Sequence, residues 1–382
     1  MLRKASPVLF LVFLLLAGYL ALAPVPIDPV AWTAPKNLGY AGAYAVNARL
    51  ADLKQISIDA ESGPEHVAFG PDGLLYVAVA GGKILRMKPD GSAREAWAQT
   101  GGRVLGFDFN RHGDLVAADS TRGLILIDAQ PGTNGARRIT VLADKVRVGG
   151  AMDAIRFADA VVIAGDGKIY FTDASRRFGA ARWGAFDASI LDILEHSATG
   201  RVLVYDPATR AVGVVADGLS FANGIALSAD ERSIFVAETG AYRVWKLAAT
   251  ARGLQLASGS GRQDAKVVLA NLPGYPDNLM RGMNGRIWVG LVKPRNATAD
   301  DLAASPFLSK VAARLPKALW PVPPSYGHVL AFDEDGKVLA DLQDPQGHYP
   351  ETTGVTETAD RLYIQSLHAP ALGWRPKEGL GL

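Results

Sequence analysis

One short pattern recurs six times along the chain and limits the possible fold more than any other feature of the sequence. Phe221–Glu238 shows it in full: Asn223 precedes an apolar strand, a turn follows at Ala229–Glu231, and a second apolar strand surrounds Phe235. Alternation with a period of two, interrupted by turn residues, is typical of a β-hairpin. The six copies of the second strand are Leu74–Val79, Asp114–Asp119, Lys168–Asp173, Ser233–Glu238, Arg286–Leu291 and Arg361–Ser366.

The number and spacing of these copies predict the fold. A third strand with outward polar residues follows several copies, as at Lys83–Met87 and Arg243–Leu247, and Ala211–Val215 reads as a fourth strand. Four short antiparallel strands per unit, repeated six times at intervals of roughly 55 residues, describe an all-β, six-bladed β-propeller. Six copies in register are too many for a β-sandwich, which is the competing fold. We therefore assign residues 40–382 to the propeller.

The composition restricts the chemistry. The chain has no cysteine, which excludes disulfides, thiolate metal sites and cysteine nucleophiles. The formal net charge is only +2, and no basic run is interleaved with aromatic residues, so we expect no nucleic-acid partner. Any metal ion must use oxygen or histidine ligands.

The N-terminus predicts export. Arg3 and Lys4 precede the uncharged apolar run Val8–Ala23, and a positive segment before such a run keeps the N-terminus in the cytoplasm. With Pro24–Ile27 added, the run approaches the length that spans a bilayer. We therefore expect an N-terminal transmembrane helix as a signal-anchor.

The alternative is a removed signal peptide, because Ala21–Ala23 resembles a cleavage site, although Pro24 should hinder cleavage. We divide this part of the chain into an anchor at residues 1–24 and a stiff Pro-rich linker at residues 25–39. In both cases the propeller lies on the non-cytoplasmic side of the membrane, in a bacterial periplasm or its equivalent.

A helical insertion is expected at residues 298–324, between blades five and six. Thr298–Asp301 can cap a helix, and apolar residues at helical spacing follow in the order Leu308, Val311, Leu315 and Leu319. Such a helix could cover the channel as a lid, rest on a membrane surface, or simply pack on the propeller. The segment around Trp183–Leu194 could form a second insertion at the same rim.

Each repeat also contains an equivalent position ahead of its second strand, which we call the slot. The slot lies eleven or twelve residues before the central residue of that strand. In blade order it holds Glu65, Leu105, Asp159, Asn223, Asp277 and Thr352, with the neighbouring Thr353 as the alternative in the last blade. In a propeller, equivalent positions are related by rotation about the channel, so we expect four oxygen-bearing side chains to converge there.

Three converging carboxylates cannot all remain ionised unless a cation joins them. Oxygen ligands of mixed carboxylate and amide type suit a hard cation, and Ca²⁺ better than Mg²⁺. The predicted metal ligands are Glu65, Asp159, Asn223 and Asp277, with Asn278 as a weaker candidate that could instead cap a turn. The plain alternative is that each is an ordinary polar residue of a turn or strand edge.

Several of these segments carry a resemblance to a known family. The segments are Gly63–Glu65, Phe157–Asp159 leading to Tyr170–Asp173, Phe221–Gly224, and Pro273–Asn278. Together they resemble the strictosidine synthase-like family, and the likeness covers nearly the whole chain. Related six-bladed propellers include the paraoxonases and the gluconolactonase (regucalcin) group.

The resemblance implies a Ca²⁺ ion on the channel axis, held by Glu65, Asn223 and Asp277, with Asp159 where relatives usually have Asn. It further implies a hydrolase of a small ester or lactone, in which the metal polarises the scissile carbonyl, so Glu65 and Asp277 are also catalytic candidates. Leu105 departs from the histidine of paraoxonases.

The last blade departs from the plant enzymes, whose catalytic glutamate is replaced by Thr352 or Thr353. Glu351 is adjacent but out of register, so a strictosidine-synthase-type condensation is not expected. These departures leave a second hypothesis open: an anchored, non-catalytic propeller with a structural Ca²⁺ that binds a ligand or a protein partner.

The remaining candidates are histidines and recurring acidic residues. His348 and His368 lie near the last blade and could activate water, although surface positions are the simpler interpretation. Asp119, Asp173 and Glu238 recur at one position of the second strand, so we assign them a structural role as acceptors of backbone hydrogen bonds.

Overall fold

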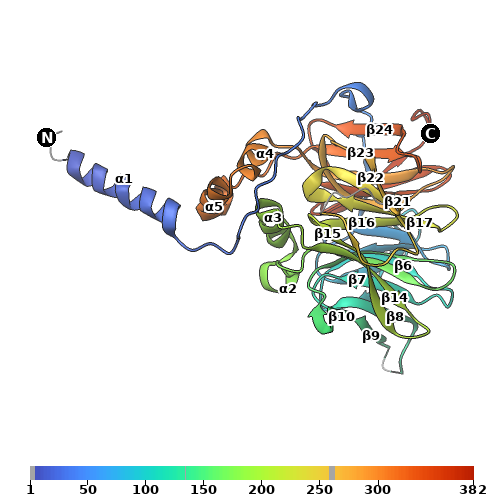
Figure 1. Cartoon of the computed structure of the whole chain (residues 1–382). Helices are drawn as coiled ribbons and strands as arrows, with labels where there is room; N and C mark the ends of the chain where they lie inside the picture. The colour runs from blue at the N-terminus through green and yellow to red at the C-terminus, as the bar shows by residue number, and fades with distance from the viewer. Residues whose placement is uncertain (1–4, 134, 258–262) are drawn as a thin grey trace.

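The computed structural model describes residues 5–133, 135–257 and 263–382, and it confirms the six-bladed β-propeller (Figure 1). Arg3 and Lys4, on which the export prediction drew, lie outside the described residues.

Blade one contains β2 (His66–Phe69), β3 (Leu75–Ala78), β4 (Lys83–Met87) and β5 (Glu95–Gln99); blade two contains β6 (Val104–Phe109), β7 (Leu115–Asp119), β8 (Gly123–Pro131) and β9 (Arg137–Ala143).

The third and fourth blades follow after the hairpin of β10 (Lys145–Val148) and β11 (Ala151–Ala154). Blade three contains β12 (Ala158–Ile163), β13 (Ile169–Asp173), β14 (Gly200–Asp206) and β15 (Ala211–Leu219), with β19 (Leu254–Gln255) added in parallel at its edge; blade four contains β16 (Ala222–Leu227), β17 (Ser233–Glu238), β18 (Arg243–Ala248) and β20 (Ala265–Leu269).

The last blade is completed by the N-terminal strand β1 (Lys54–Ser57), which pairs antiparallel with β27 (Ala371–Pro376). Joining the two ends of the chain in one sheet closes the ring and leaves only short, protected edges. Blade five contains β21 (Gly274–Arg281), β22 (Ile287–Pro294), β23 (Gly327–Phe332) and β24 (Val338–Asp344); blade six contains β25 (Thr352–Glu357), β26 (Arg361–Ser366), β27 and β1.

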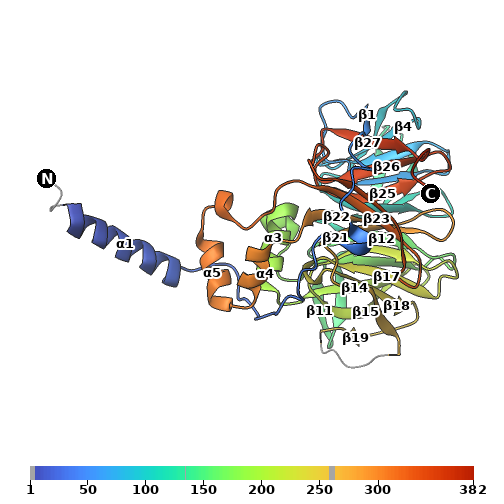
Figure 2. The same ribbon diagram turned by 90° about the horizontal axis from the view of Figure 1, so that it is seen from above.

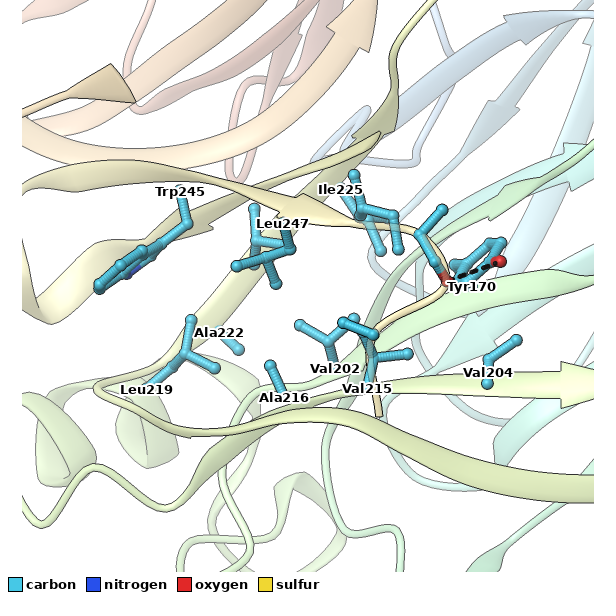
Figure 3. Close-up of a cluster of buried hydrophobic side chains, with 14 of the residues drawn as sticks. Tyr170, Val202, Val204, Val215, Ala216, Leu219, Ala222, Ile225, Trp245 and Leu247 are labelled. Carbon is cyan, nitrogen blue, oxygen red and sulfur yellow. Dashed lines mark hydrogen bonds between the residues drawn. The ribbon is translucent and has the colours of Figure 1, made fainter. Parts of the chain in front are cut away.

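Apolar layers between neighbouring blades form the core. Figure 3 shows the layer between blades three and four, where Val202 and Val215 face Ile225 and Leu247. The hydroxyl of Tyr170, in the same layer, donates to the carbonyl of Ala249 at 3.2 Å, so its polar atom is not left unpaired. Each blade therefore buries its apolar faces against both neighbours, which holds the innermost strands in a fixed ring.

Both helical insertions leave their blade after its second strand. In blade three, α2 (Ala180–Trp183) and α3 (Ala185–Glu195) lie between β13 and β14; in blade five, α4 (Ala297–Ala303), α5 (Pro306–Arg314) and the 3₁₀ turn η3 (Lys317–Leu319) lie between β22 and β23. The predicted position between blades five and six was therefore wrong, because β22 pairs with β23 in one sheet. Figures 1 and 2 show α3, α4 and α5 on the same face of the propeller.

The predicted single helix is two short helices, each with its own cap. The side chain of Asn296 accepts from the backbone N–H groups of Thr298 and Ala299, and the Ser305 hydroxyl accepts from that of Leu308. Thr298 is therefore not the cap. Pro306 stands at the first position of α5, where a missing N–H costs nothing, and α5 ends at Arg314, before Leu315 and Leu319 of the apolar pattern.

The predicted linker is fixed to these helices. The backbone N–H of Asp28 donates to the Glu195 carboxylate at 2.8 Å, and that of Trp32 donates to the carbonyl of Ala303 at 2.8 Å. Ile27 is only 3% exposed and packs in the apolar cluster under α3. The segment thus joins both insertions, which the sequence did not predict.

Helix α1 (Ala5–Leu22) projects away from the propeller on the side of the insertions (Figures 1 and 2). Within it, Val8–Leu16 expose between 49% and 67% of their surface. In the described part of the chain, no helix is both long and apolar enough to cross a membrane, so the predicted transmembrane helix is not supported.

Candidate functional site

Strand pairing gives the slot an equivalent position in blades three, four and six. The residues just before it pair with the second strand, as Ala158 does with Asp173, Ala222 with Glu238, and Thr352 with Ser366. An irregularity in register follows each pair, and the slot residue stands within it. In the last blade, Thr353 therefore occupies the slot.

Contacts across the blades place the slots next to one another. The Thr172 hydroxyl donates to the carbonyl of Asn223 at 2.8 Å and accepts from the N–H of Ala160, which follows Asp159, at 3.0 Å. A Cβ on Gly224 would lie 2.4 Å from the carbonyl oxygen of Asp277, so only glycine permits this close approach.

Asn278 completes this ring of contacts. Its side-chain NH₂ donates to the carbonyl of Glu65 at 3.0 Å and lies 3.4 Å from Glu65 Oε1. Asn278 lies within β21 and links blade five to blade one, so it does not cap a turn. The slots of blades three, four, five and one consequently lie around one end of the channel.

The recurring acidic residues have the structural role that the sequence predicted. Asp173 Oδ1 accepts from the N–H of Phe157 at 2.9 Å, and Glu238 Oε1 accepts from that of Ser220 at 2.9 Å. Both donors lie two or three residues before a slot. These carboxylates therefore fix the segment that enters each innermost strand and, with it, the direction of the slot side chain.

Burial raises the pKa values of all three slot carboxyls, and repulsion between slot carboxyls adds to it at Asp159 and Asp277. Glu65 and Asp159 are each 3% exposed and Asp277 is 7% exposed. Burial raises the pKa of Glu65 to about 7, while the nearby Arg103 opposes this shift. Burial and the charge of Glu65 raise the pKa of Asp159 well above its usual range. Burial and the charges of Glu65 and Asp159 raise the pKa of Asp277 in the same way.

Three buried oxygen atoms around the carboxyls have no hydrogen-bond partner: Glu65 Oε2, Asn223 Oδ1 and Asn278 Oδ1. Leaving a buried polar atom unpaired costs about 1–3 kcal/mol. Within the described residues, no group of three or more His, Cys, Asp and Glu side chains could hold a metal ion. The amide oxygens therefore belong to any candidate ligand set, and this mixed oxygen set fits a hard cation.

An apolar pocket lies directly beside these oxygens. Asn223 and Asp277 line one side of it, and Phe186, Ile190 and Leu194 of α3 line another. Pro321–Pro323, which follow η3, complete the wall, and the cavity has a volume of about 90 Å³. Both insertions thus cover the pocket, in agreement with the lid that the sequence suggested.

The two candidate histidines differ in their surroundings. His348 Nδ1 lies 3.2 Å from Asp344 Oδ1, and its side chain is 68% exposed, away from the residues that line the pocket. His368 follows Leu367, which lines the pocket, and its ring lies 5.5 Å from that of Phe186.

Sequence reasoning missed two cations at the site. Arg103 Nη2 lies 3.6 Å from Glu65 Oε2 with a side chain only 13% exposed, and Lys293 lines the pocket. The signal available in the sequence for Arg103 was an arginine two residues before the Leu105 slot. Lys293 lies near the end of β22, outside the repeated pattern, and gave no comparable signal.

The ring of blades and the cluster of buried acidic and amide oxygens at its channel define a propeller with a candidate cation site. The chain belongs to the strictosidine synthase-like family. Its residues 159–251 match the family model described as strictosidine synthase, and residues 42–87 match the one described as strictosidine synthase-like, N-terminal.

Curated relatives show the same family. Protein STRICTOSIDINE SYNTHASE-LIKE 4 of Arabidopsis thaliana is 32% identical over 82% of this chain and 78% of its own length. Adipocyte plasma membrane-associated protein of Danio rerio is 30% identical over 91% of this chain and 83% of its own length.

Solved structures share the fold. A gluconolactonase of Xanthomonas campestris aligns with a TM-score of 0.58 at 20% identity, over 93% of this chain and 98% of its own. The calcium-binding protein regucalcin of Agrobacterium tumefaciens aligns with a TM-score of 0.52 at 14% identity, over 84% of this chain and 92% of its own.

Proposed function

We propose that this protein is a Ca²⁺-dependent hydrolase of a small ester or lactone. Two observations carry the proposal: buried oxygens of Glu65 and Asn223 have no hydrogen-bond partner among the described residues, and Asn223 and Asp277 line an apolar pocket. A gluconolactonase and a calcium-binding protein share this fold, which agrees with the proposal.

Glu65, Asn223 and Asp277 would hold the ion, the charge of Asp159 would lie beside them, and Asn278 would orient Glu65. A bound Ca²⁺ supplies a Lewis acid that polarises a carbonyl oxygen. The chain supplies the rest: α3 and Pro321–Pro323 exclude water from the pocket, and its apolar wall favours substrates with a hydrocarbon group.

The proposal is tested by assaying the purified full-length protein on phenyl acetate and on an aliphatic γ-lactone, with Ca²⁺ or with excess chelator. Glu65→Gln should abolish both calcium binding and hydrolysis, and Glu378→Gln, a change at an exposed glutamate, should alter neither. Full activity in excess chelator, or in Glu65→Gln, would contradict the proposal.

A second candidate function is a non-catalytic propeller that binds a ligand or partner around a structural Ca²⁺. Leu105 and Thr353 favour it, because neither of these two slots carries an acid, a base or a strong metal ligand. A protein that gains thermal stability with Ca²⁺ but hydrolyses neither ester nor lactone would have this second function.

We also propose that α1 associates with a lipid surface, because its exposed side chains from Val8 to Leu16 are apolar. Wild-type protein should float with phosphatidylcholine vesicles. The double change Phe13→Asp and Leu16→Asp should abolish flotation, whereas Leu339→Asp, at an exposed leucine of β24, should not. Equal flotation of all three proteins would contradict the association.

A further inference from the structure

A charged cluster borders the apolar pocket at blade six. The carboxylate of Glu351 joins two partners: its Oε1 lies 2.9 Å from Lys293 Nζ, and its Oε2 is hydrogen-bonded to His368 Nδ1. The side chains of Lys293 and Glu351 are 12% and 11% exposed, whereas His368 is 51% exposed. Lys293 and Glu351 are thus largely buried in the protein, whereas half of the His368 side chain is exposed to solvent.

The backbone holds Glu351 in this place. Its φ of 52° lies in the left-handed region that residues other than glycine rarely adopt. The N–H of Leu367 donates to the carbonyl of Glu351 at 3.1 Å, and the Ser366 hydroxyl donates to the carbonyl of Pro350 at 2.5 Å. The segments before β25 and after β26 are therefore tied together, which fixes the distance between Glu351 and His368.

The cluster also contacts the residues that surround the pocket. Lys293 and Leu367 line it together with Asn223 and Asp277. Phe186 of the lid lines it too, and its ring meets that of His368 edge-on, at 5.5 Å and 74°. His368 consequently lies between Phe186 of the lid and Glu351, next to Leu367 of the pocket wall.

We propose that His368 is the general base of the hydrolytic reaction, positioned by Glu351, with Lys293 keeping Glu351 ionised. This inference rests on the proposed function and names a catalytic group that the slots lack. Donation of Nδ1–H to Glu351 leaves the lone pair of Nε2 free to accept a proton. In such an arrangement the histidine acts as the base, and the carboxylate is its positioning residue.

The reaction balances with water as the only co-reactant. Nε2 takes a proton from water while the water oxygen bonds to the acyl carbon, and the carbonyl π electrons move to the carbonyl oxygen. The carbonyl then re-forms, the bond from the acyl carbon to the alcohol oxygen breaks, and that oxygen takes the proton from Nε2. In a lactone, the leaving oxygen is the ring oxygen.

The charged groups that face His368 are Glu351, Lys293 and Glu65. Lys293 and the hydrogen bond from His368 lower the pKa of Glu351 against the effect of its burial, so the carboxylate is the form present at neutral pH. His348 has an equivalent partner in Asp344 but does not border the pocket.

The test uses full-length protein with saturating Ca²⁺ and phenyl acetate. His368→Gln should lower kcat by at least about 100-fold, the usual contribution of a general base, and should leave calcium affinity unchanged. Glu351→Gln should lower kcat about 10-fold, because His368 loses the carboxylate that orients its ring. His112→Gln, at an exposed turn histidine, is the matched control and should behave as wild type.

Nitrogen-15 NMR of the histidine side chains supplies a readout independent of activity: His368 should carry its proton on Nδ1 in wild type and lose this preference in Glu351→Gln. Hydrolysis that Glu65→Gln loses but His368→Gln retains within about threefold overturns the base and leaves the proposed function standing. Absence of hydrolysis in wild type overturns both. An unprotonated Nδ1 overturns the positioning role of Glu351.

Discussion

Calcium should stabilise the protein more strongly as the pH rises. In the metal-free protein, burial and repulsion raise the pKa values of Glu65, Asp159 and Asp277 above those of the unfolded chain. The native state then binds more protons than the unfolded state, so stability is fully present below the unfolded pKa values and is lost as the pH rises through the folded ones. A bound cation offsets this loss, because it stabilises the ionised carboxylates.

Glu65 alone sets the scale of the effect. Its pKa rises from 4.5 to about 7, and one pKa unit corresponds to about 1.4 kcal/mol, so the metal-free protein should lose on the order of 3 kcal/mol between about pH 5 and about pH 8. At about 2 °C per kcal/mol for a chain of this size, the loss corresponds to a fall in Tm of about 6 °C. Asp159 and Asp277 act in the same direction.

Differential scanning fluorimetry with Ca²⁺ or with chelator measures this directly. The gain in Tm on adding Ca²⁺ should be small at about pH 5 and several degrees larger at about pH 8. Glu65→Gln should remove most of the pH dependence, and Glu378→Gln should retain it. An equal gain at both pH values, or none, would refute the reasoning.

Three further changes test other parts of the structure. Arg201→Ala removes the partner of buried Asp173, whose Oδ2 lies 2.8 Å from Arg201 Nη2, and should cost about 3–5 kcal/mol in urea unfolding; an unchanged midpoint would contradict this. Burial raises the pKa of Asp192 to about 7, so wild type should lose more stability than Asp192→Asn as the pH rises from about 4 to 7; parallel Tm profiles would count against it. Glu195→Gln removes the charge that holds the linker at Asp28 and should speed proteolysis there; unaltered cleavage would mean that the other contacts suffice.

The sequence predicted the propeller because each blade repeats one local pattern. The second strands, from β3 to β26, lie where the alternation placed them, since turn residues and apolar faces act over a few positions. The closure of the ring by β1 was not predicted, because it depends on a pairing between distant ends of the chain. The insertion in blade five was misplaced for the same reason: only the pairing of β22 with β23 shows that both strands belong to one blade.

The residues of the candidate site that recur at the same position in successive blades could be predicted from the sequence. Glu65, Asp159, Asn223 and Asp277 share one register position, so counting residues found them. Arg103, Lys293 and Glu351 do not follow the repeat, and the turns that bring Glu351 to His368 are peculiar to blade six. Asn278 could not be distinguished from a turn cap until the contact with the Glu65 carbonyl was seen.

The most direct test of the account is the position of the metal. Anomalous diffraction from crystals of the full-length protein grown with Ca²⁺ should show one strong peak among Glu65, Asp159, Asn223 and Asp277, at the floor of the apolar pocket. A calcium-replete crystal without a peak among these four side chains would contradict the central claim.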